Sequence, residues 1–198
     1  MPVRVVCQRV QEATLTIYDV PIPSSIVSVN PQSAAVDATI HNGVILYVAF
    51  LNPCTEEDVL ASVETLISTK IYSDDVVPQL SAQSSVSQAG VEEGNASKHA
   101  LQDLVYVNVM IIPQASLGSK IKGKSTQSHA LVQRVVGRSY YVLFCETMAS
   151  RLGACGCAGG EVALVDERRG RAMVCGTFGE KQRLRMISDG PNSHFFDL

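Results

Sequence analysis

The chain has 198 residues, of which 46% are hydrophobic and 18% charged, and its formal net charge is −3. This length allows a sizeable core, and we expect a single domain over residues 1–198. The charge argues against a uniformly basic nucleic-acid binder, and no apolar run is long enough for a membrane-spanning helix. The N-terminal sequence MPVRVVCQRV lacks the long apolar region and cleavage site of a secretory signal, so we expect a cytoplasmic protein.

Six cysteines are scattered along the chain, which favours reduced thiols over a disulfide framework. Cys155 and Cys157 are separated by one residue, whereas a zinc-binding pair usually has two or more residues between its cysteines and needs a second pair. We therefore expect no metal site and no cofactor.

The first half of the chain predicts strands followed by a helix. Residues 3–10 and 12–17 are rich in β-branched residues and are expected to form two paired strands. Residues 18–42 contain three prolines and several serines, which indicates a long loop before a buried strand, GVILYVAF. Thr55 is suited to cap a helix with an acidic first turn. The predicted apolar face of that helix consists of Val59, Leu60, Val63, Leu66 and Ile67.

The second half alternates strands and helices. Residues 104–112 form an apolar run of strand length, which favours a central place in a sheet. A helix is expected within residues 128–151, and short strands at 171–175 and 182–187. The predicted core residues of this helix are Leu131, Val135, Tyr141, Phe144, Cys145 and Met148. Surface insertions are expected near residues 18–42, 81–103 and 153–170. The predicted class is α/β, with mixed β-sheets and packed helices.

One segment matches the phosphate-binding loop of nucleotide hydrolases. GSKIKGKS, from Gly118 to Ser125, has its glycines, lysine and serine at the required spacing, and EVALVDE downstream resembles the strand whose acid holds magnesium. In such loops the glycine run follows its strand directly, whereas here PQASL stands between them. A P-loop nucleotide hydrolase is therefore a disfavoured alternative.

A serine hydrolase is a second alternative, because Ser116, His129 and His194 are present. None of the candidate serines lies in the glycine–any–serine–any–glycine elbow of such enzymes, so the pattern does not favour this class.

A basic segment follows the central strand. From Gly118 to Arg138 there is no acidic residue, and the basic residues are Lys120, Lys122, Lys124, Arg134 and Arg138. Such a patch commonly binds a phosphate backbone, although a solvated lysine-rich loop is equally consistent with the charge alone.

Three stretches resemble the D-aminoacyl-tRNA deacylase family. VRVVCQRVQEATLTI resembles the opening strands of that family. IIPQASL lies where the family has its serine-glutamine-phenylalanine-threonine-leucine motif, and SDGPNSH lies where it has its Gly-Pro motif. The resemblance covers most of the chain outside residues 18–40, 81–103 and 153–170. It implies a single-domain, homodimeric fold and an enzyme that hydrolyses aminoacyl-tRNA esters in proofreading, with aminoacyl-tRNA as its partner.

Two substitutions distinguish the chain within this family. Pro113 replaces the usual serine and Ala115 the bulky residue of the motif, and KIKGKSTQSH replaces the downstream segment. These features resemble the animal-type paralogue, which implies removal of L-alanine wrongly attached to threonine tRNA, with some activity on D-aminoacyl esters. A catalytically degenerate tRNA-binding module is the non-enzymatic alternative.

The resemblance also assigns the candidate site. It implies catalytic roles for Gln114, Ala115, Ser116 and Leu117. It implies substrate contacts for Pro113, Arg9, Gly190 and Pro191, and contacts with tRNA phosphates for Lys120, Lys122 and Lys124. Gly190 and Pro191 would come from the partner subunit, and the cis or trans state of their bond is open. Since Pro113 ends strand pairing, we expect a bend that aims the backbone N–H groups of Ala115, Ser116 and Leu117 at the developing oxyanion.

Overall fold

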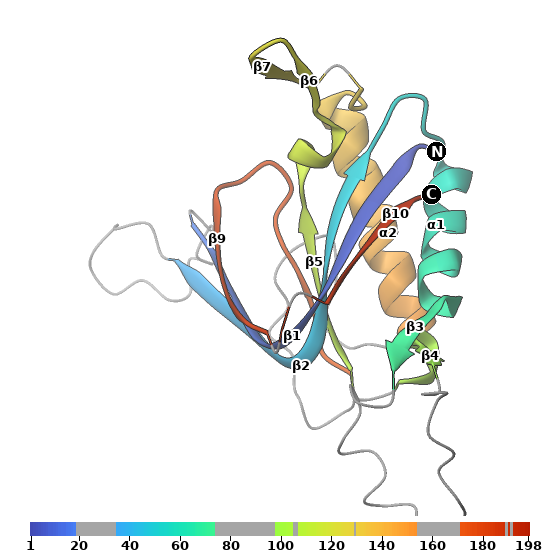
Figure 1. Ribbon diagram of the computed structural model, residues 1–198, viewed down its shortest axis with the longest axis vertical. Helices are drawn as coiled ribbons and strands as arrows, with labels where there is room; N and C mark the ends of the chain where they lie inside the picture. Colours follow the sequence, from blue (N-terminus) through green and yellow to red (C-terminus); the bar gives the residue numbers. More distant parts are fainter. Residues whose placement is uncertain are drawn as a thin grey trace, which may run out of the picture.

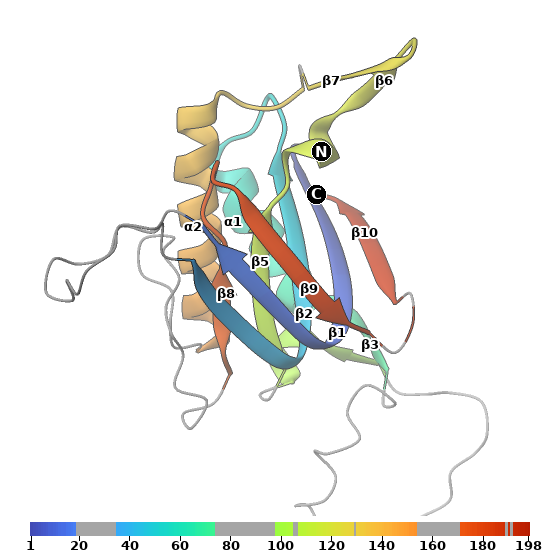
Figure 2. The same cartoon turned by 90° about the vertical axis from the view of Figure 1, so that its left-hand side faces the viewer.

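The computed structural model describes residues 1–18, 35–73, 98–104, 107–128, 130–153, 171–188, 190 and 192–198. Within these residues a mixed sheet of six strands carries two helices on one face (Figures 1 and 2). The strand order is β10-β1-β2-β5-β8, and β9 also pairs with β1. The sheet strands are β1 (Val3–Ile17), β2 (Val36–Phe50), β5 (Asn108–Pro113), β8 (Met173–Cys175), β9 (Gln182–Ile187) and β10 (Ser193–Asp197), and the helices are α1 (Glu56–Ser68) and α2 (Arg134–Leu152). The predicted α/β class with mixed strands and packed helices is confirmed.

β1 and β2 are longer than the sequence analysis predicted. They pair antiparallel from Val3↔Phe50 to Ile17↔Val36, so β1 continues through the expected break at residue 11. β2 begins inside the expected loop of residues 18–42. The sequence signal for this extension is the alternation of apolar Ala38 and Ile40 with polar neighbours, and both residues are buried in the structure.

The sheet separates two hydrophobic cores. The larger core lies between the sheet and the helices, and it contains Leu46 and Ile111 from the strands and Phe144 from α2. The smaller core lies on the opposite face, where the far halves of β1 and β2 curl over together with β9, and it contains Leu15 and Met110 (Figure 2). Because the central strands are buried on both faces, they read as continuous apolar runs.

α1 begins as the sequence predicts. The Thr55 hydroxyl accepts a hydrogen bond from the Asp58 N–H at 3.2 Å, and the Asp58 carboxylate accepts one from the Thr55 N–H at 2.8 Å. The predicted apolar face is buried except for Leu60, which is 41% exposed. The reciprocal cap therefore fixes the start of the helix, and one residue of its face was wrongly assigned to the core.

α2 begins later than its apolar pattern suggests. Its predicted core residues are buried except Val135, which is 79% exposed in the first turn, and Leu131, which lies before the helix. Leu131 forms an isolated bridge with Leu51, and the Val132 N–H donates to Phe50 O at 3.2 Å. Residues 130–132 thus extend the sheet instead of the helix.

β5 lies between β2 and β8 and is parallel to both. The carboxyl ends of β2 and β5 therefore reach the same edge of the sheet. The predicted strand at 104–112 begins only at Asn108, because the Val107 N–H donates to Leu104 O in a turn. Farther from this edge, β3 (Lys70–Ser73) pairs with β4 (Lys98–Ala100), which lies inside the expected insertion at 81–103. The rest of that insertion, and most of those near 18–42 and 153–170, lie outside the described residues.

Two remaining expectations concern cysteines and membranes. Cys7, Cys54 and Cys145 are free thiols, whereas Cys175 is disulfide-bonded, which corrects the expectation of reduced thiols at that residue. Cys155 and Cys157 lie outside the described residues. No helix in the described part of the chain is long and apolar enough to cross a membrane.

Candidate active site

Pro113 ends β5 at a point where its missing N–H costs no ladder bond. The Val109 N–H donates toward β8 at 2.9 Å, whereas the Gln114 N–H donates toward β2, to Val48 O, at 2.8 Å. Alternate residues of a parallel strand face opposite neighbours, so the nitrogen of Pro113 faces the β8 side. The pairing of β8 with β5 stops at Ile111. The proline therefore closes the strand as the sequence predicts.

A single 3-10 turn, η4 (Ala115–Gly118), follows this strand end. The Leu117 N–H donates to Gln114 O at 3.2 Å, so this predicted oxyanion donor is used within the turn. Among the described residues, the N–H groups of Ala115 and Ser116 have no backbone acceptor, as is usual for the first residues of a helical turn. Both residues are exposed. Two of the three predicted amide donors can therefore reach a ligand.

Gln114 and Ser116 hold each other in place. Gln114 Nε2 donates to Ser116 Oγ at 2.7 Å, which leaves the hydroxyl proton of Ser116 able to donate to a ligand. No histidine of the described residues is hydrogen-bonded to Ser116; His194 lies on β10 opposite Cys7, and His129 lies outside the described residues. The serine-hydrolase alternative therefore has no Ser–His pair in the part of the chain that the structure describes.

The free thiols are not suited to attack a substrate. Burial raises the pKa of the Cys7 thiol to about 11, although its hydrogen bond with Tyr72 opposes the shift. Burial likewise raises the pKa of Cys145 to about 12, and burial together with the charge of Asp58 raises that of Cys54 to about 11. These three thiols stay protonated near neutral pH, and the thiolate is the nucleophilic form.

Gly118 packs η4 against the body of the protein. A Cβ atom at this position would overlap Leu131 and would lie 2.9 Å from Leu51 Cδ2. Leu51 and Leu131 are the two residues of the bridge that joins the end of β2 to the segment before α2. A Cβ at this position would force the two leucine side chains to move, so glycine permits this close approach.

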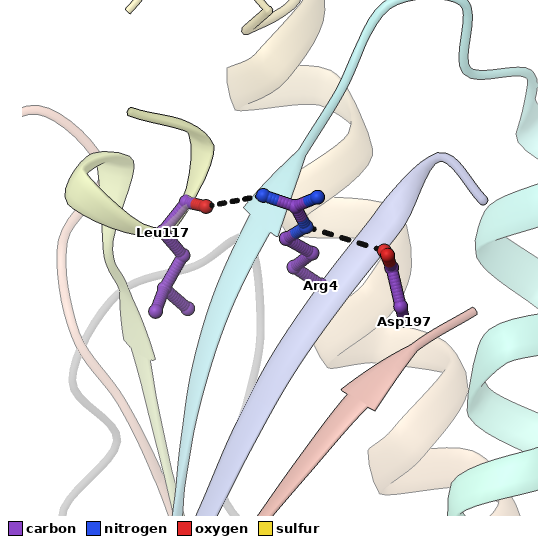
Figure 3. A network of polar contacts seen from close by, with 3 residues as sticks. All are labelled: Arg4, Leu117 and Asp197. Atoms are coloured by element: carbon purple, nitrogen blue, oxygen red, sulfur yellow. Dashed lines mark hydrogen bonds and ion pairs between the residues drawn. The ribbon is translucent and has the colours of Figure 1, made fainter. Parts of the chain in front are cut away.

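Arg4 is a positioning residue that sequence patterns did not single out. Its Nη1 donates to Leu117 O at 3.0 Å, and its Nε donates to Asp197 Oδ1 at 3.2 Å (Figure 3). Arg4 thus ties η4 to β10, the last strand. In the sequence it is marked only as a charged residue between two valines, Val3 and Val5, in the opening strand. Both valines are buried in the structure.

A cavity of about 420 Å³ opens beside Arg4. Met1 and Pro2 line it from the N-terminus, Asp58 from α1 and Lys120 from the segment that follows η4. Two cationic side chains and one carboxylate therefore line the cavity, and Arg4 connects it to η4 through its hydrogen bond to Leu117 O.

A small hairpin with an exposed surface follows η4. It consists of β6 (Lys120–Lys122) and β7 (Ser125–Gln127), and it projects from the body of the molecule (Figures 1 and 2). Gly123 occupies its turn with a φ of +63°, and the three lysines are exposed. In a phosphate-binding loop the glycine-lysine-serine sequence leads into a helix, whereas here Ser125 begins a strand. The nucleotide-hydrolase alternative is therefore wrong.

The arginines of the basic segment have a different role. Arg134 Nη2 donates to Gly179 O at 3.2 Å, and Arg138 Nη2 donates to Phe178 O at 3.3 Å. These two arginines contact the turn between β8 and β9. Of the predicted basic residues, the three lysines are therefore the ones that lie on the hairpin.

Residues 188–192 connect β9 to β10 and contain the predicted Gly-Pro motif. The Arg9 N–H donates to Asn192 O at 3.1 Å, and the Arg9 carbonyl accepts from Ser188 Oγ at 2.9 Å. Gly190 is exposed and has a φ of +148°, a conformation that L side chains rarely adopt. Pro191 lies outside the described residues. The main chain of Arg9 therefore holds this connection, and the predicted contact from its side chain stays a prediction.

η4 and the connection between β9 and β10 are bonded to different parts of β1. η4 is bonded to β1 at Arg4, whereas residues 188–192 are bonded to β1 at Gln8 and Arg9. Four to five residues of extended strand separate these points by about 15 Å, and both views show the start of β10 at the end of the β1–β10 pair that lies away from η4 (Figures 1 and 2). η4 and Gly190 therefore lie at separate places along β1 in this chain.

Known proteins resemble the chain in sequence and in structure. Residues 6–197 match the model of a family described as D-Tyr-tRNA(Tyr) deacylase. A putative D-tyrosyl-tRNA(Tyr) deacylase 2 of Leishmania major is 32% identical over 172 residues, covering 79% of this chain and 87% of the relative. D-aminoacyl-tRNA deacylase 2 of Gallus gallus is 28% identical over 162 residues, covering 80% and 78%. A solved structure of a probable eukaryotic D-amino acid tRNA deacylase superposes with a TM-score of 0.71 at 28% identity, covering 100% of both chains.

Proposed function

The chain belongs to the D-Tyr-tRNA(Tyr) deacylase family, and from this premise we propose that it removes wrongly attached amino acids from tRNA. It is an aminoacyl-tRNA deacylase, a hydrolase that cleaves the ester between an amino acid and the terminal ribose and releases free amino acid and tRNA. The family predicted from the three sequence motifs is confirmed, and relatives named deacylase 2 agree with the predicted paralogue.

The main support for the proposed chemistry is the pair of exposed N–H groups in η4. Ester hydrolysis places negative charge on the former carbonyl oxygen, and preorganised N–H donors stabilise that charge. The exposed N–H groups of Ala115 and Ser116 are suited to this role, because the packing of Gly118 holds the turn in place. We assign the oxyanion site to these two amides.

Water is the proposed nucleophile. The described free thiols stay protonated, and Ser116 has no described histidine base, so neither is assigned a covalent role. The Ser116 hydroxyl, oriented by Gln114, positions the ester or the attacking water. The neighbouring 2′-hydroxyl of the RNA is the further group that can move a proton. The free Oε1 of Gln114 can accept from the terminal nucleotide or the amino group, with Pro113 and Leu117 as flanking walls.

The hairpin and the cavity are the proposed RNA-binding surfaces. Lys120, Lys122 and Lys124 are exposed on an arm beside η4, where they can contact acceptor-stem phosphates. Such contacts give affinity with little sequence choice. The cavity beside Arg4 and Lys120 can take the end of the RNA chain.

We assign the site to a homodimer in which Gly190 and Pro191 of the partner subunit line the amino-acid pocket. The separation of the two motifs within one chain supports this arrangement. It also explains how two motifs that are bonded to separate parts of β1, at Arg4 and at Arg9, can act on one substrate. The cytoplasm, where translation takes place, is the proposed location.

The proposed preference is for L-alanine on threonine tRNA. It is supported by Pro113 and Ala115, which replace larger or more polar residues of the family motif and leave room beside the turn. The test compares three labelled esters at catalytic enzyme concentration: L-alanyl-tRNA(Thr), D-alanyl-tRNA(Thr) and correctly charged L-threonyl-tRNA(Thr).

The outcomes of this test distinguish the L-alanine preference, the deacylase activity and the tRNA-binding alternative. Preferred cleavage of L-alanyl-tRNA(Thr), with L-threonyl-tRNA(Thr) spared, is the expected result. Cleavage of the D-alanyl ester alone would retain the deacylase and reject the L-alanine preference. Binding of tRNA without cleavage of any ester would replace the enzyme by a tRNA-binding module.

A further inference from the structure

Residues 188–192 occupy a gap in the pairing along one edge of β1. β10 pairs with residues 4–8 of that strand, and β9 pairs with residues 12–17. Between these ladders, both peptide groups of Arg9 are bonded to the ends of the connecting loop, at Ser188 and Asn192. The exposed Gly190 therefore lies between two anchored residues, Ser188 and Asn192.

The Gly190 carbonyl is turned toward its own chain. It accepts one hydrogen bond from Ser188 Oγ at 2.7 Å and a second from the Asn192 N–H at 2.8 Å. A carbonyl oxygen has two lone pairs, so these bonds use its accepting capacity. The oxygen is therefore not free to accept a hydrogen bond from a ligand.

The Ser188 hydroxyl is the adjustable part of this arrangement. Its single proton lies within reach of two carbonyl oxygens, that of Gly190 at 2.7 Å and that of Arg9 at 2.9 Å. Gln8 Nε2 donates to the Arg9 carbonyl at 2.9 Å and also lies 3.3 Å from Ser188 Oγ. Gln8 supplies the Arg9 carbonyl with a hydrogen-bond donor. The Ser188 hydroxyl can therefore donate its hydrogen bond to the Gly190 carbonyl.

Ser193 fixes the orientation of the Gln8 amide. Its hydroxyl donates to Gln8 Oε1, so the NH₂ end of the amide must face Ser188 and Arg9. Each donor in this group then meets an acceptor. Ser193, Gln8 and Ser188 form a chain of hydrogen bonds, called here the Ser188 tether, that ends on the Gly190 carbonyl.

Packing does not hold Gly190. No described atom lies within 4 Å of the position that a Cβ would occupy, and the residue is exposed. The Gly190 carbonyl turns about the ψ bond of a residue without a Cβ, so its two hydrogen bonds help to set the direction in which it points. Loss of the Ser188 hydroxyl would leave the Asn192 N–H as the described donor to that oxygen.

We propose that Ser188 is a positioning residue that sets substrate specificity by holding the Gly190 carbonyl away from the amino-acid pocket. The inference rests on the proposed function, in which Gly190 of the partner subunit lines that pocket. A carbonyl oxygen released into the pocket would compete with a side chain on the α-carbon of the bound ester. A tethered carbonyl leaves that space to the methyl group of L-alanine.

The test compares L-alanyl-tRNA(Thr) with glycyl-tRNA(Thr), because glycine lacks the methyl group that a released carbonyl would exclude. In the full-length chain, Ser188→Ala should lower the L-alanyl to glycyl ratio of kcat/KM about fivefold, the effect of one hydrogen bond of ordinary net strength. Ser188→Thr keeps a hydroxyl and should keep the ratio. Ser68→Ala is the matched control, since Ser68 Oγ donates to Glu64 O at 2.7 Å on α1.

The outcomes distinguish this inference from the proposed function. An unaltered chain that cleaves neither ester would reject the function itself. An active unaltered chain with the same ratio in folded Ser188→Ala would overturn the tether and leave the deacylase intact. If Ser188→Ala does not fold, Gln8→Ala provides the test, because it leaves the Arg9 carbonyl to compete for the Ser188 proton. The ratio should then fall in the same direction, and an unchanged ratio would overturn the proposal.

Discussion

η4 and the loop at residues 188–192 are the two halves of the proposed site, and different forces hold them. η4 is held by packing, with Gly118 against Leu51 and Leu131, and by the Arg4 side chain. Of the described residues of the loop, Ser188 and Asn192 are hydrogen-bonded to Arg9, and space is open around the Cβ position of Gly190.

This difference indicates a division of labour. Close-packed groups resist small displacements, whereas a hydrogen bond can be exchanged for another at modest cost. The half that we assign to the chemistry is therefore rigid, and the half that we assign to amino-acid selection is adjustable. Substitutions in η4 should lower stability and activity together, whereas those in the loop should change activity or specificity with little effect on stability.

Gly118→Ala should have the largest effect. The added methyl group overlaps Leu131 and approaches Leu51, and overpacking of this kind costs about 1–3 kcal/mol of unfolding free energy. A displaced η4 should also lower kcat/KM by about a hundredfold. Urea unfolding and deacylation kinetics measure the two effects. Gly153→Asn, at the end of α2, is the control, because its φ of +60° suits asparagine and the site is open. Unchanged stability in Gly118→Ala would contradict the packed anchor.

Gly190→Ala should have the next largest effect, on activity rather than on stability. Its φ of +148° is strained for alanine, but no described atom would be displaced. The loop should shift and lower activity while the unfolding midpoint changes little.

The same variant tests whether the site spans a dimer. Gly190→Ala and Gln114→Ala homodimers should both be weak, but a mixed dimer has one site with both motifs intact. After subunit exchange, random mixing should restore about a quarter of the unaltered activity. Mixtures that stay as weak as their components would argue against a site built from two subunits.

Lys122→Ala should have a smaller effect that does not depend on the amino acid. Loss of one phosphate contact should weaken tRNA binding and lower the slope of log affinity against log salt by about one unit. Lys70→Ala, on β3, is the control and should leave the slope unchanged. Titrations at several salt concentrations measure both slopes. An unaltered slope for Lys122→Ala would remove that lysine from the RNA interface.

Alkaline pH should lower the stability of the whole fold and should distinguish least between η4 and the loop, because the group that titrates is a buried core residue, Cys7. The ordinary pKa of a cysteine thiol is 9.0, and burial raises that of Cys7 to about 11. The protonated thiol is thus favoured in the folded state. Its contribution to stability is fully present below pH 9 and is lost as the pH rises toward 11. Urea unfolding at pH 8 and pH 10.5 should show this loss, and Cys7→Ala should show a shallower one. Equal slopes would contradict the assigned shift.

Much of the fold and part of the site could be predicted from local sequence. Thr55 caps α1, Pro113 ends β5, and the order of the motifs indicates the family. The predictions of secondary structure were wrong where pairing with a distant segment overrode the local sequence pattern. Leu131 has a helical spacing but pairs with Leu51, and residues 36–42 contain loop-like polar residues but pair with β1.

The sequence by itself determined the caps, the strand end and the two motifs, because each depends on neighbouring residues and on backbone preferences. Only the tertiary structure decided which residues support those motifs. Arg4 meets Leu117 across 113 residues, and Ser188 meets Arg9 across 179 residues. Contacts at such separations depend on strand register, and register is set by the pairing of the whole sheet and by burial on both of its faces.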